Sequence, residues 1–377
     1  MSNRAHPAAP APAPVLVTGG AGYVGSHVAH ALVDAGERVI VIDDLSTGSP
    51  AALPPEADLV EGDVADRALL DAVLAKSKAD AILHLAGSTV VPESCRDPLR
   101  YYANNTLASH ALIAAARHHG VECVLFSSTA AVYGAISTDP VDESAALAPA
   151  SPYGASKLMT ERMLADAAVA HGLSTAALRY FNVAGADPAG RTGQSTPGAT
   201  HLVKVAVQAA LGLRAGLEVF GTDWPTPDGT CIRDYIHVSD LAEAHLAVLA
   251  HLRTGRQAAL AAGRPPPPAR VFNVGYGRGA SVRDVIAAVR RVAGKSFPVT
   301  DRPRRPGDLP AVVARADRIR RETGWRARRD ALDTIVADAL AWERRLIAAA
   351  GTASLPSKPS SRTTALPRKE AKHAEIG

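Results

Sequence analysis

A phenol and an ammonium group stand four residues apart in the segment Ser151-Pro152-Tyr153-Gly154-Ala155-Ser156-Lys157. Residues at this spacing lie on one face of a helix, so the ammonium of Lys157 would stabilise the phenolate of Tyr153. Such a charge lowers the pKa of a tyrosine from its reference value of about 10. Tyr153 is therefore a candidate general base. Because this spacing also arises by chance, the position of the pair in the fold must decide whether Tyr153 and Lys157 are catalytic.

Hydroxyl groups precede this pair in the chain, at the end of a short apolar run. The run from Cys123 ends in Ser127-Ser128-Thr129. A hydroxyl at the end of a buried strand could hydrogen-bond a substrate oxygen, and capping of an ordinary turn is the alternative. Thr129 is the candidate for the substrate contact.

A glycine-rich turn follows the first apolar run, in Thr18-Gly19-Gly20-Ala21-Gly22-Tyr23-Val24-Gly25. Glycines let a backbone turn tightly and approach a pyrophosphate, whose charge is met by the N-terminus of the next helix. Asp43 ends the second run, where a carboxylate accepts hydrogen bonds from a ribose 2′-hydroxyl and repels a 2′-phosphate. This pattern favours NAD over NADP. Gly62-Asp63-Val64 ends the third run and either flanks the adenine or forms a plain turn.

These residues need a scaffold, and the first half of the chain predicts one. Short apolar runs alternate there with longer amphipathic stretches, which is typical of a parallel sheet covered by helices on both faces. Helices closed by Gly36 and Gly120 are expected over Tyr23–Ala35 and Tyr101–His119. The fold class is therefore α/β, a doubly wound parallel (Rossmann) sheet. The predicted strands are Val15–Thr18, Arg38–Asp43, Asp58–Glu61, Ala81–Leu85, Cys123–Ser127 and Thr175–Arg179.

The remainder of the chain predicts a smaller C-terminal substrate-binding lobe. We expect a cofactor domain over 15–181, to which later segments return, and the lobe over 182–348. Four consecutive prolines from Pro265 make the stretch 253–270 a predicted flexible insert that does not continue the preceding helix. Residues 1–14 and 349–377 are expected to be disordered tails. Helices are expected in the lobe at His201–Leu211, Ser239–Leu252, Ser281–Ala293 and Asp330–Ala348.

Composition limits the class of partner. A formal charge of +4 and a pI of about 9.0 point weakly to anionic ligands and not to nucleic acid. No apolar run is long enough to span a bilayer, and residues 1–14 lack the apolar core of a secretory signal, so a cytoplasmic protein that does not bind membranes is expected. Cys95, Cys123 and Cys231 fit neither a disulfide framework nor a metal site, and we interpret them as reduced, buried thiols.

With these motifs in place, the sequence resembles the extended short-chain dehydrogenase/reductase superfamily and, within it, the UDP-glucose 4-epimerases. The resemblance runs from Val15 to about Trp342, apart from the stretch 253–270. Besides the glycine turn and the Tyr/Lys pair, it rests on His84-Leu85-Ala86-Gly87, Tyr101-Tyr102-Ala103-Asn104-Asn105, Arg179-Tyr180-Phe181-Asn182, the segment Asp228 to Val238 and Arg305-Pro306-Gly307-Asp308-Leu309-Pro310.

The resemblance implies a role for each matching residue. It makes Tyr153 the base, Lys157 the group that holds the nicotinamide ribose, and Thr129 the ligand of the sugar O4. The implied contacts with NAD are Gly19, Gly22, Tyr23, Val24, Gly25, Asp43, Asp63, Val64, Leu85, Ala86, Gly87, Asn105, Tyr153, Lys157 and Phe181. The implied contacts with the UDP-sugar are Thr129, Asn182, His201, Phe220, Arg233, Arg305, Asp308 and Val312.

Three positions bear on how far the resemblance carries. Thr89 stands where some relatives have a Lys near the cofactor, and His201 replaces an Asn that contacts the diphosphate in some members. Val312 stands where a bulky aromatic goes with restriction to glucose and galactose. Because Val is smaller, the resemblance implies a low activity on UDP-N-acetylglucosamine, although a Val that simply packs against its neighbours is the alternative.

The resemblance implies NAD-dependent epimerisation at C4 of a UDP-hexose, UDP-glucose and UDP-galactose, through a transient 4-keto sugar. Other nucleotide-sugar 4-epimerases, acting on UDP-N-acetylhexosamines or UDP-pentoses, stay open. A 4,6-dehydratase would follow the active-site Thr with Asp-Glu, whereas Thr129 is followed by Ala130-Ala131. A non-catalytic NAD sensor would not need the Tyr/Lys pair. No metal is implied, and the family commonly forms homodimers through two helices, here Tyr101–His119 and Pro152–His171.

Overall fold

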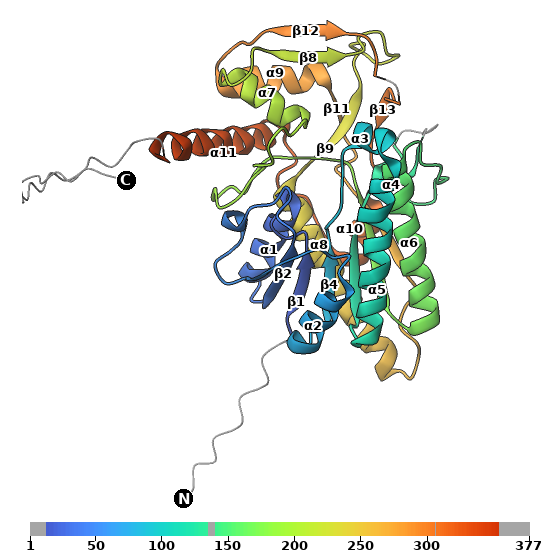
Figure 1. Cartoon of the computed structure of the whole chain (residues 1–377). Helices are drawn as coiled ribbons and strands as arrows, with labels where there is room; N and C mark the ends of the chain where they lie inside the picture. Colours follow the sequence, from blue (N-terminus) through green and yellow to red (C-terminus); the bar gives the residue numbers. More distant parts are fainter. Residues whose placement is uncertain (1–12, 135–139, 306, 354–377) are drawn as a thin grey trace, which may run out of the picture.

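A parallel sheet of seven strands forms the centre of the molecule (Figure 1). The computed structural model describes residues 13–134, 140–305 and 307–353. The strand order is β10-β6-β5-β4-β1-β2-β3, and each neighbouring pair is parallel, which confirms the doubly wound fold. The strands are β1 Val15–Thr18, β2 Val39–Asp43, β3 Asp58–Glu61, β4 Ala81–His84, β5 Cys123–Thr129, β6 Ser174–Tyr180 and β10 Arg270–Val274.

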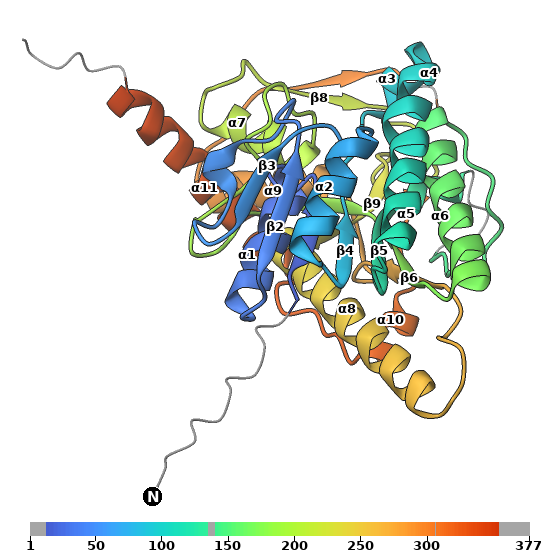
Figure 2. The ribbon, with the colours of Figure 1, turned by 60° about the horizontal axis from the view of Figure 1, so that its bottom comes forward.

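Helices cover both faces of this sheet (Figure 2). Side chains alternate along each strand, so Val15 and Val17 pack with α1 Tyr23–Asp34 and α8 Val238–Ala261, while Leu16 between them packs on the opposite face. That face is covered by α2 Arg67–Ser77, α5 Ala108–His118 and α6 Pro152–His171. Both faces are therefore buried, as near-continuous apolar strands require.

The predicted helix over Tyr101–His119 is divided in the structure. It comprises the end of α4 Pro98–Tyr101, a π-helical turn η2 over Tyr102–Leu107 and then α5. Such turns inside helices occur frequently at functional sites. This one carries Asn105, which is buried. Short helices also occur at η1 Pro50–Ala52, α3 Val91–Arg96 and η3 Ala130–Val132.

The smaller C-terminal lobe lies above the carboxyl ends of the strands in Figure 1. It contains α7 Leu202–Ala210, α9 Val282–Ala293 and the long helix α11 Leu332–Ala353. A two-stranded sheet pairs β8 Leu217–Phe220 with β12 Val299–Arg302. A second small sheet joins β7 Asn182–Ala184, β9 Ile232–His237, β11 Gly279–Ser281 and β13 Ala311–Val312, and α10 Asp317–Thr323 packs against α8 and β10.

The flexible insert predicted over 253–270 is wrong. Helix α8 continues to Ala261, and Arg253 binds the carboxylates of Glu37 and Asp80 from this extension. The helix ends before Gly263, which has a φ of +64°, so the prolines begin only after it has closed. Arg270 then opens β10, whose side chains Phe272 and Val274 are buried beside β6. The second half of the chain therefore completes the sheet.

Two smaller predictions also need correction. Cys95 is exposed on the short helix α3, whereas Cys123 and Cys231 are buried as expected. The tail predicted over 349–377 begins too early, because α11 continues to Ala353. The rest of that tail and residues 1–12 lie outside the described residues. In the described part of the chain, no helix combines the length and the apolar character needed to cross a membrane.

Candidate active site

Helix α6 places Tyr153 and Lys157 beside the end of β5. Ser151 caps this helix by accepting a hydrogen bond from the backbone N–H of Gly154 at 3.2 Å. Tyr153 is 8% exposed and Lys157 is 3% exposed, so both polar groups are buried. The Nζ of Lys157 donates to the carbonyl of Ser127 at 3.1 Å. The predicted pair therefore shares one buried face of a helix, directly against the sheet.

The expected effect of Lys157 on the pKa of Tyr153 is not seen in this structure. Burial raises the pKa of the Tyr153 phenol, because the phenolate loses its hydration, and a hydrogen bond with the Thr129 side chain offsets only part of this. Burial also lowers the pKa of Lys157 to about 8. The ammonium is directed at the carbonyl of Ser127 and not at the phenol. That Lys157 lowers the pKa of Tyr153 therefore stays a prediction from the sequence.

Thr129 lies at the junction of β5 and η3. Its hydroxyl accepts a hydrogen bond from the backbone N–H of Ala131 at 3.2 Å, which caps this short helix. The same side chain forms a hydrogen bond with Tyr153 and so offsets part of the rise in the pKa of Tyr153 that burial causes. Capping and contact with the phenol therefore occur together at this residue.

The glycine turn between β1 and α1 is shaped by close contacts that no larger residue would allow. Gly19 has a φ of +69°, and a Cβ there would lie 2.6 Å from the backbone nitrogen of Ala86. A Cβ at Gly25 would lie 2.0 Å from the carbonyl oxygen of Gly19. Gly22 caps α1 without a side-chain hydrogen bond, so the start of that helix presents backbone N–H groups. This is the cradle that a pyrophosphate requires.

Asp43, which is predicted to bind the ribose, is the last residue of β2. Asp63 and Val64, which are predicted to flank the adenine, follow the end of β3. The carboxylate of Asp43 accepts hydrogen bonds from the backbone N–H groups of Ala21, at 2.8 Å, and Leu45, at 2.9 Å. The first bond ties the end of β2 to the glycine turn. Asp63 is exposed and accepts from the N–H of Ala65 at 2.8 Å, while Val64 is buried.

The end of β4 connects the glycine turn to the Tyr/Lys pair. Gly87 has a φ of +146°, and a Cβ there would lie 2.8 Å from Oδ1 of Asn105 and 3.5 Å from Nζ of Lys157. Asn105 accepts from the N–H of Ser88 at 2.8 Å and donates to the hydroxyl of Ser156 at 3.0 Å. The predicted residues Leu85, Ala86, Gly87 and Asn105 therefore lie between the glycine turn and Lys157.

His84 is a site neighbour whose role the sequence did not predict. Its ring nitrogens contact the hydroxyls of Thr18, at 2.7 Å, and Ser109, at 2.8 Å. Burial, with a smaller contribution from the nearby charge of Lys157, lowers the pKa of His84 to about 3. A neutral His84 thus fixes β4 to β1 and α5 behind the glycine turn. Its place before Leu85 in the quoted motif is the signal that could have indicated it.

Four predicted substrate residues form a second group in the C-terminal lobe. Arg233 on β9 donates to the carbonyl of Leu309 at 2.8 Å and lies 3.9 Å from the carboxylate of Asp308. The guanidinium of Arg305 stacks on the ring of Phe220, 3.6 Å from its centroid. Asp308 donates its backbone N–H to the carbonyl of Arg305 at 3.3 Å. An aromatic face, two cations and one carboxylate thus lie on connected segments.

The remaining predicted residues are spread between these two groups. Asn182 is exposed on β7 and pairs with Tyr235, and His201 is exposed just before α7. Phe181 is buried in a small apolar cluster against which Val312 also packs. The packing alternative for Val312 therefore describes its contacts in this structure.

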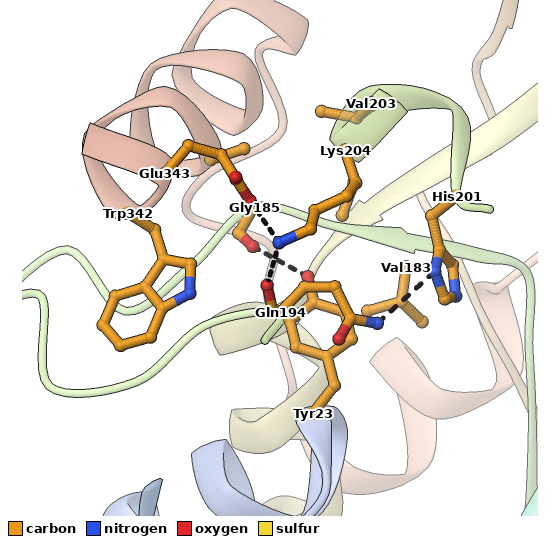
Figure 3. Close-up of a pocket in the computed structure, with 11 residues that line it drawn as sticks. Tyr23, Val183, Gly185, Gln194, His201, Val203, Lys204, Trp342 and Glu343 are labelled. Carbon is orange, nitrogen blue, oxygen red and sulfur yellow. Dashed lines mark hydrogen bonds and ion pairs between the residues drawn. The ribbon is translucent and has the colours of Figure 1, made fainter. Parts of the chain in front are cut away.

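A small cavity of about 20 Å³ joins Tyr23 of the cofactor turn to the C-terminal helix (Figure 3). Tyr23 donates its hydroxyl to the carbonyl of Gly185 at 2.8 Å. Lys204 of α7 forms a buried ion pair with Glu343 of α11. The sequence did not indicate this pair, because its partners are far apart in the chain and match no local spacing. His201 lines the same cavity, which places it near the first turn of α1.

Comparisons with known proteins agree with this arrangement. The model of the NAD dependent epimerase/dehydratase family matches residues 15–275. A UDP-glucose 4-epimerase of Azospirillum brasilense is 57% identical over 349 residues, covering 93% of this chain and 97% of that protein. The crystal structure of the Brucella ovis UDP-glucose 4-epimerase in complex with NAD has a TM-score of 0.82 at 43% identity and covers 88% of this chain and 98% of that one.

A third relative carries a UDP-sugar. The UDP-glucose-4-epimerase of Stenotrophomonas maltophila, solved with bound NAD and formylated UDP-arabinopyranose, has a TM-score of 0.84 at 37% identity. It covers 90% of this chain and 100% of that one. With the Tyr/Lys helix, the glycine cradle and these relatives in view, the chain belongs to the NAD dependent epimerase/dehydratase family, in its UDP-glucose 4-epimerase branch.

Proposed function

We propose that this protein is an NAD-dependent epimerase that inverts C4 of a UDP-hexose, interconverting UDP-glucose and UDP-galactose. The observation that carries the proposal is the buried Tyr153–Lys157 face of α6, placed against Thr129 at the end of β5 and reached from the glycine turn through Gly87. The identity of 57% to a UDP-glucose 4-epimerase along 93% of the chain supports the same activity.

The residues of the sheet edge fit NAD. A Cβ at Gly19 or Gly25 would fill the space at the N-terminus of α1, so the backbone there is free to meet a pyrophosphate. The carboxylate of Asp43 is placed to hold a ribose with a free 2′-hydroxyl. Lys157 and Asn105 lie where the nicotinamide ribose would be held. When bound, NAD supplies a reversible acceptor for the hydride of the sugar C4.

The chain's own groups would position the sugar and move its proton. Tyr153 would take the proton of the 4-hydroxyl and return it, and the hydroxyl of Thr129 would hold O4 through a hydrogen bond. Because burial raises the pKa of Tyr153, a bound cation beside it is needed to favour the phenolate. Lys157, whose ammonium binds the carbonyl of Ser127 on the same buried side of α6, is the cation that we propose for this role.

The second group would hold the UDP portion. Arg233 and Arg305 would neutralise the diphosphate, Phe220 would flank the uracil, and Asp308 would bind the uridine ribose. Asn182 and His201 lie nearer to the sheet and would contact the diphosphate from that side. A diphosphate gripped from both sides would leave the hexose free to turn and present either face of C4.

The rival dehydratase reaction needs a proton donor and acceptor next to the active-site Thr. Ala130 and Ala131 occupy these positions, in the short helix η3. Neither side chain can transfer a proton, so epimerisation is the reaction that this site supports.

The finer properties of the protein extend this proposal. The proposed NAD-binding part comprises 15–181 together with β10, and the proposed UDP-sugar part comprises the rest of 182–348. A homodimer through α6 and the helix formed by η2 and α5 is supported by exposed apolar side chains there, including Leu107, Met159 and Val169. A cytoplasmic location is in keeping with the reaction proposed.

The deciding experiment is a product analysis. The purified protein should carry NAD without supplementation and should convert UDP-galactose to UDP-glucose with no net release of NADH. Chromatography of the products and acid extraction of the protein measure both. Stoichiometric NADH would indicate a dehydrogenase, and a 4-keto-6-deoxy product would indicate a dehydratase.

A further inference from the structure

The catalytic helix carries a third buried polar residue on the same face as Tyr153 and Lys157. Glu161 follows Lys157 by four residues, as Lys157 follows Tyr153, and it is 8% exposed. Lys and Glu four residues apart on a helix ordinarily attract each other. Yet among residues 13–134, 140–305 and 307–353 no ion pair that involves Lys157 is found. The carboxylate of Glu161 is held elsewhere.

Arg179 on β6 is the group that holds it. Its Nη2 donates to Oε2 of Glu161 at 2.6 Å, and its Nε donates to Oε1 at 3.0 Å, in an ion pair whose side chains are 3% and 6% exposed. Ser128 of β5 donates its hydroxyl to Oε1 at 2.5 Å. Both carboxylate oxygens are therefore engaged, and a bidentate Arg pair is the strongest arrangement available to them.

Arg179 is in turn fixed by neighbours that carry no opposing charge. Its Nη1 donates to the hydroxyl of Tyr133 at 3.1 Å, and Tyr133 donates to Oδ1 of Asn273 on β10 at 2.6 Å. The guanidinium lies 4.9 Å from the centroid of the Tyr133 ring. Its only carboxylate partner in the described part of the chain is Glu161.

We propose that Arg179 is a positioning residue for the reaction: by holding the carboxylate of Glu161, it prevents that carboxylate from pairing with Lys157. This inference rests on the proposed function. Three consecutive residues of β5 each bind a different residue of this helix face. The carbonyl of Ser127 accepts a hydrogen bond from Lys157, and the hydroxyl of Ser128 donates one to Glu161. The side chain of Thr129 contacts Tyr153. Within the described residues, the ammonium of Lys157 thereby keeps the carbonyl of Ser127 as its partner and forms no ion pair.

The other titratable groups around the pair do not compete for this role. His84 on β4, Tyr101 on α4 and Tyr180 on β6 face Tyr153 or Lys157. Burial lowers the pKa of His84 to about 3 and raises the pKa of both tyrosines, so all three are neutral near pH 7. The carboxylate of Glu93 on α3 is held by Arg100 and the hydroxyl of Tyr101. In the described part of the chain, the charges beside Lys157 on its own helix face are therefore those of Glu161 and its partner Arg179.

Removing the guanidinium should release Glu161 toward Lys157. A carboxylate that pairs with Lys157 stabilises the ammonium and disfavours the phenolate of Tyr153. The pKa of Tyr153 should therefore rise. We expect Arg179→Gln to move the acid limb of the kcat profile upward by about one pH unit. On that limb, kcat at a fixed pH falls about tenfold. In Glu161→Gln no carboxylate is present and the charge of Arg179 is no longer balanced, so its acid limb should not move upward.

The double variant Arg179→Gln/Glu161→Gln separates this role from a merely structural one. It lacks the charge that Arg179 controls, so its acid limb should return to the wild-type position. A structural role predicts that both single variants lose stability and change the profile alike. Thr175→Val is the matched control, because its buried hydroxyl joins β6 to α6 through the carbonyl of Leu164, at the far end of the helix.

A spectroscopic measurement tests the same inference without turnover. The absorbance of tyrosinate is measured as a function of pH in each protein and in the same protein with the additional substitution Tyr153→Phe. The difference between the two titration curves gives the pKa of Tyr153. It should rise in Arg179→Gln and return in the double variant. If the wild type fails to epimerise any UDP-sugar, the proposed function is wrong, but this titration still decides the role of Arg179.

If Arg179→Gln does not fold, Ser128→Ala takes its place. That variant removes one donor to Glu161 and leaves the ion pair, so a smaller upward shift is expected. Equal acid limbs in wild type, Arg179→Gln and Glu161→Gln would overturn the proposal. If Arg179→Gln cannot be obtained, an unchanged acid limb of the kcat profile in Ser128→Ala would also overturn the proposal.

Discussion

The chemistry proposed for this protein depends on a few polar groups that are withdrawn from water. Tyr153, Lys157 and Thr129 are each less than 10% exposed. Burial acts against the charged forms of both the phenol and the ammonium, and the pKa values of both groups move accordingly. Ligands that bring charge into the site therefore have a large effect on the proton held by Tyr153.

At this scale, Tyr153→Phe tests the general base. The change removes only the ionisable oxygen, which contacts Thr129, and leaves the ring in place. We expect kcat to fall ~10²–10⁴-fold, as is typical for the loss of a general base. The content of NAD and the affinity for UDP should be nearly unchanged. Turnover at the wild-type rate would remove Tyr153 from the mechanism.

Val312→Tyr tests what limits the size of the sugar. Val312 is partly buried on β13 and packs against the cluster that contains Phe181. We expect the wild type to epimerise UDP-N-acetylglucosamine slowly, and the larger ring to abolish this activity while sparing UDP-galactose. Rates on both substrates measure the effect, with Val312→Ile as the control of intermediate size. If both rates fall together, Val312 serves packing alone.

At the scale of elements, the site is made where strand ends meet helix starts. The turn after β1 touches the turn after β4 at Gly19 and Ala86, and a hydrogen bond from Ala21 joins it to the end of β2. The cofactor cradle thus depends on how closely these backbones approach each other. One added methyl group is enough to separate them.

Gly25→Ala makes this change in the first turn of α1. The new Cβ would lie 2.0 Å from the carbonyl oxygen of Gly19, which forces the cradle apart. We expect the purified variant to retain little NAD, measured by acid extraction. Gly255→Ala is the control, because its Cβ meets Pro267 at an ordinary 3.5 Å and the helix should gain about 0.5–1 kcal/mol. Full NAD content in Gly25→Ala would contradict the cradle.

The elements also show what the sequence could and could not indicate. Apolar runs, separated by helices that end at glycines, predict six strands, and each of them has a counterpart in the sheet. β10 was missed because the prolines before Arg270 suggested disorder, although they only follow a helix that had already closed. The same error shortened α8, whose extension is fixed by Arg253 through contacts that are distant in sequence.

Charged partners were harder to predict than local motifs. The spacing of Tyr153 and Lys157 indicated their shared face, but the same rule would have paired Lys157 with Glu161. In the structure, Glu161 of α6 pairs with Arg179 of the adjacent strand β6, and Lys204 of α7 pairs with Glu343 of α11. Such choices depend on register and packing, which no local pattern contains.

At the scale of the whole molecule, the outer surface of η2, α5 and α6 carries exposed apolar side chains. Leu107, Met159 and Val169 are 65%, 43% and 85% exposed. Thr106, which precedes Leu107 in η2, contacts Met159 of α6, so Leu107 and Met159 lie where these two elements meet. Exposed apolar area of this kind is typical of an interface.

Leu107→Arg tests whether a second copy covers this surface. A charge placed there would have to be desolvated in a dimer, so we expect a dimer for the wild type and a monomer for the variant. Light scattering at micromolar concentration measures the mass. Leu260→Arg, on the exposed end of α8, is the control and should remain dimeric. A monomeric wild type would refute the proposed dimer.

The place of β10 in the sheet also affects how the protein is made. During synthesis β6 is completed about 90 residues before β10 begins, so at ~5–20 residues per second its outer edge stays unpaired for about 4 to 18 seconds. An unpaired strand edge attracts other chains. The nascent protein therefore passes through an interval in which aggregation competes with completion of the sheet, and chaperones have most to protect before Val274 has been translated.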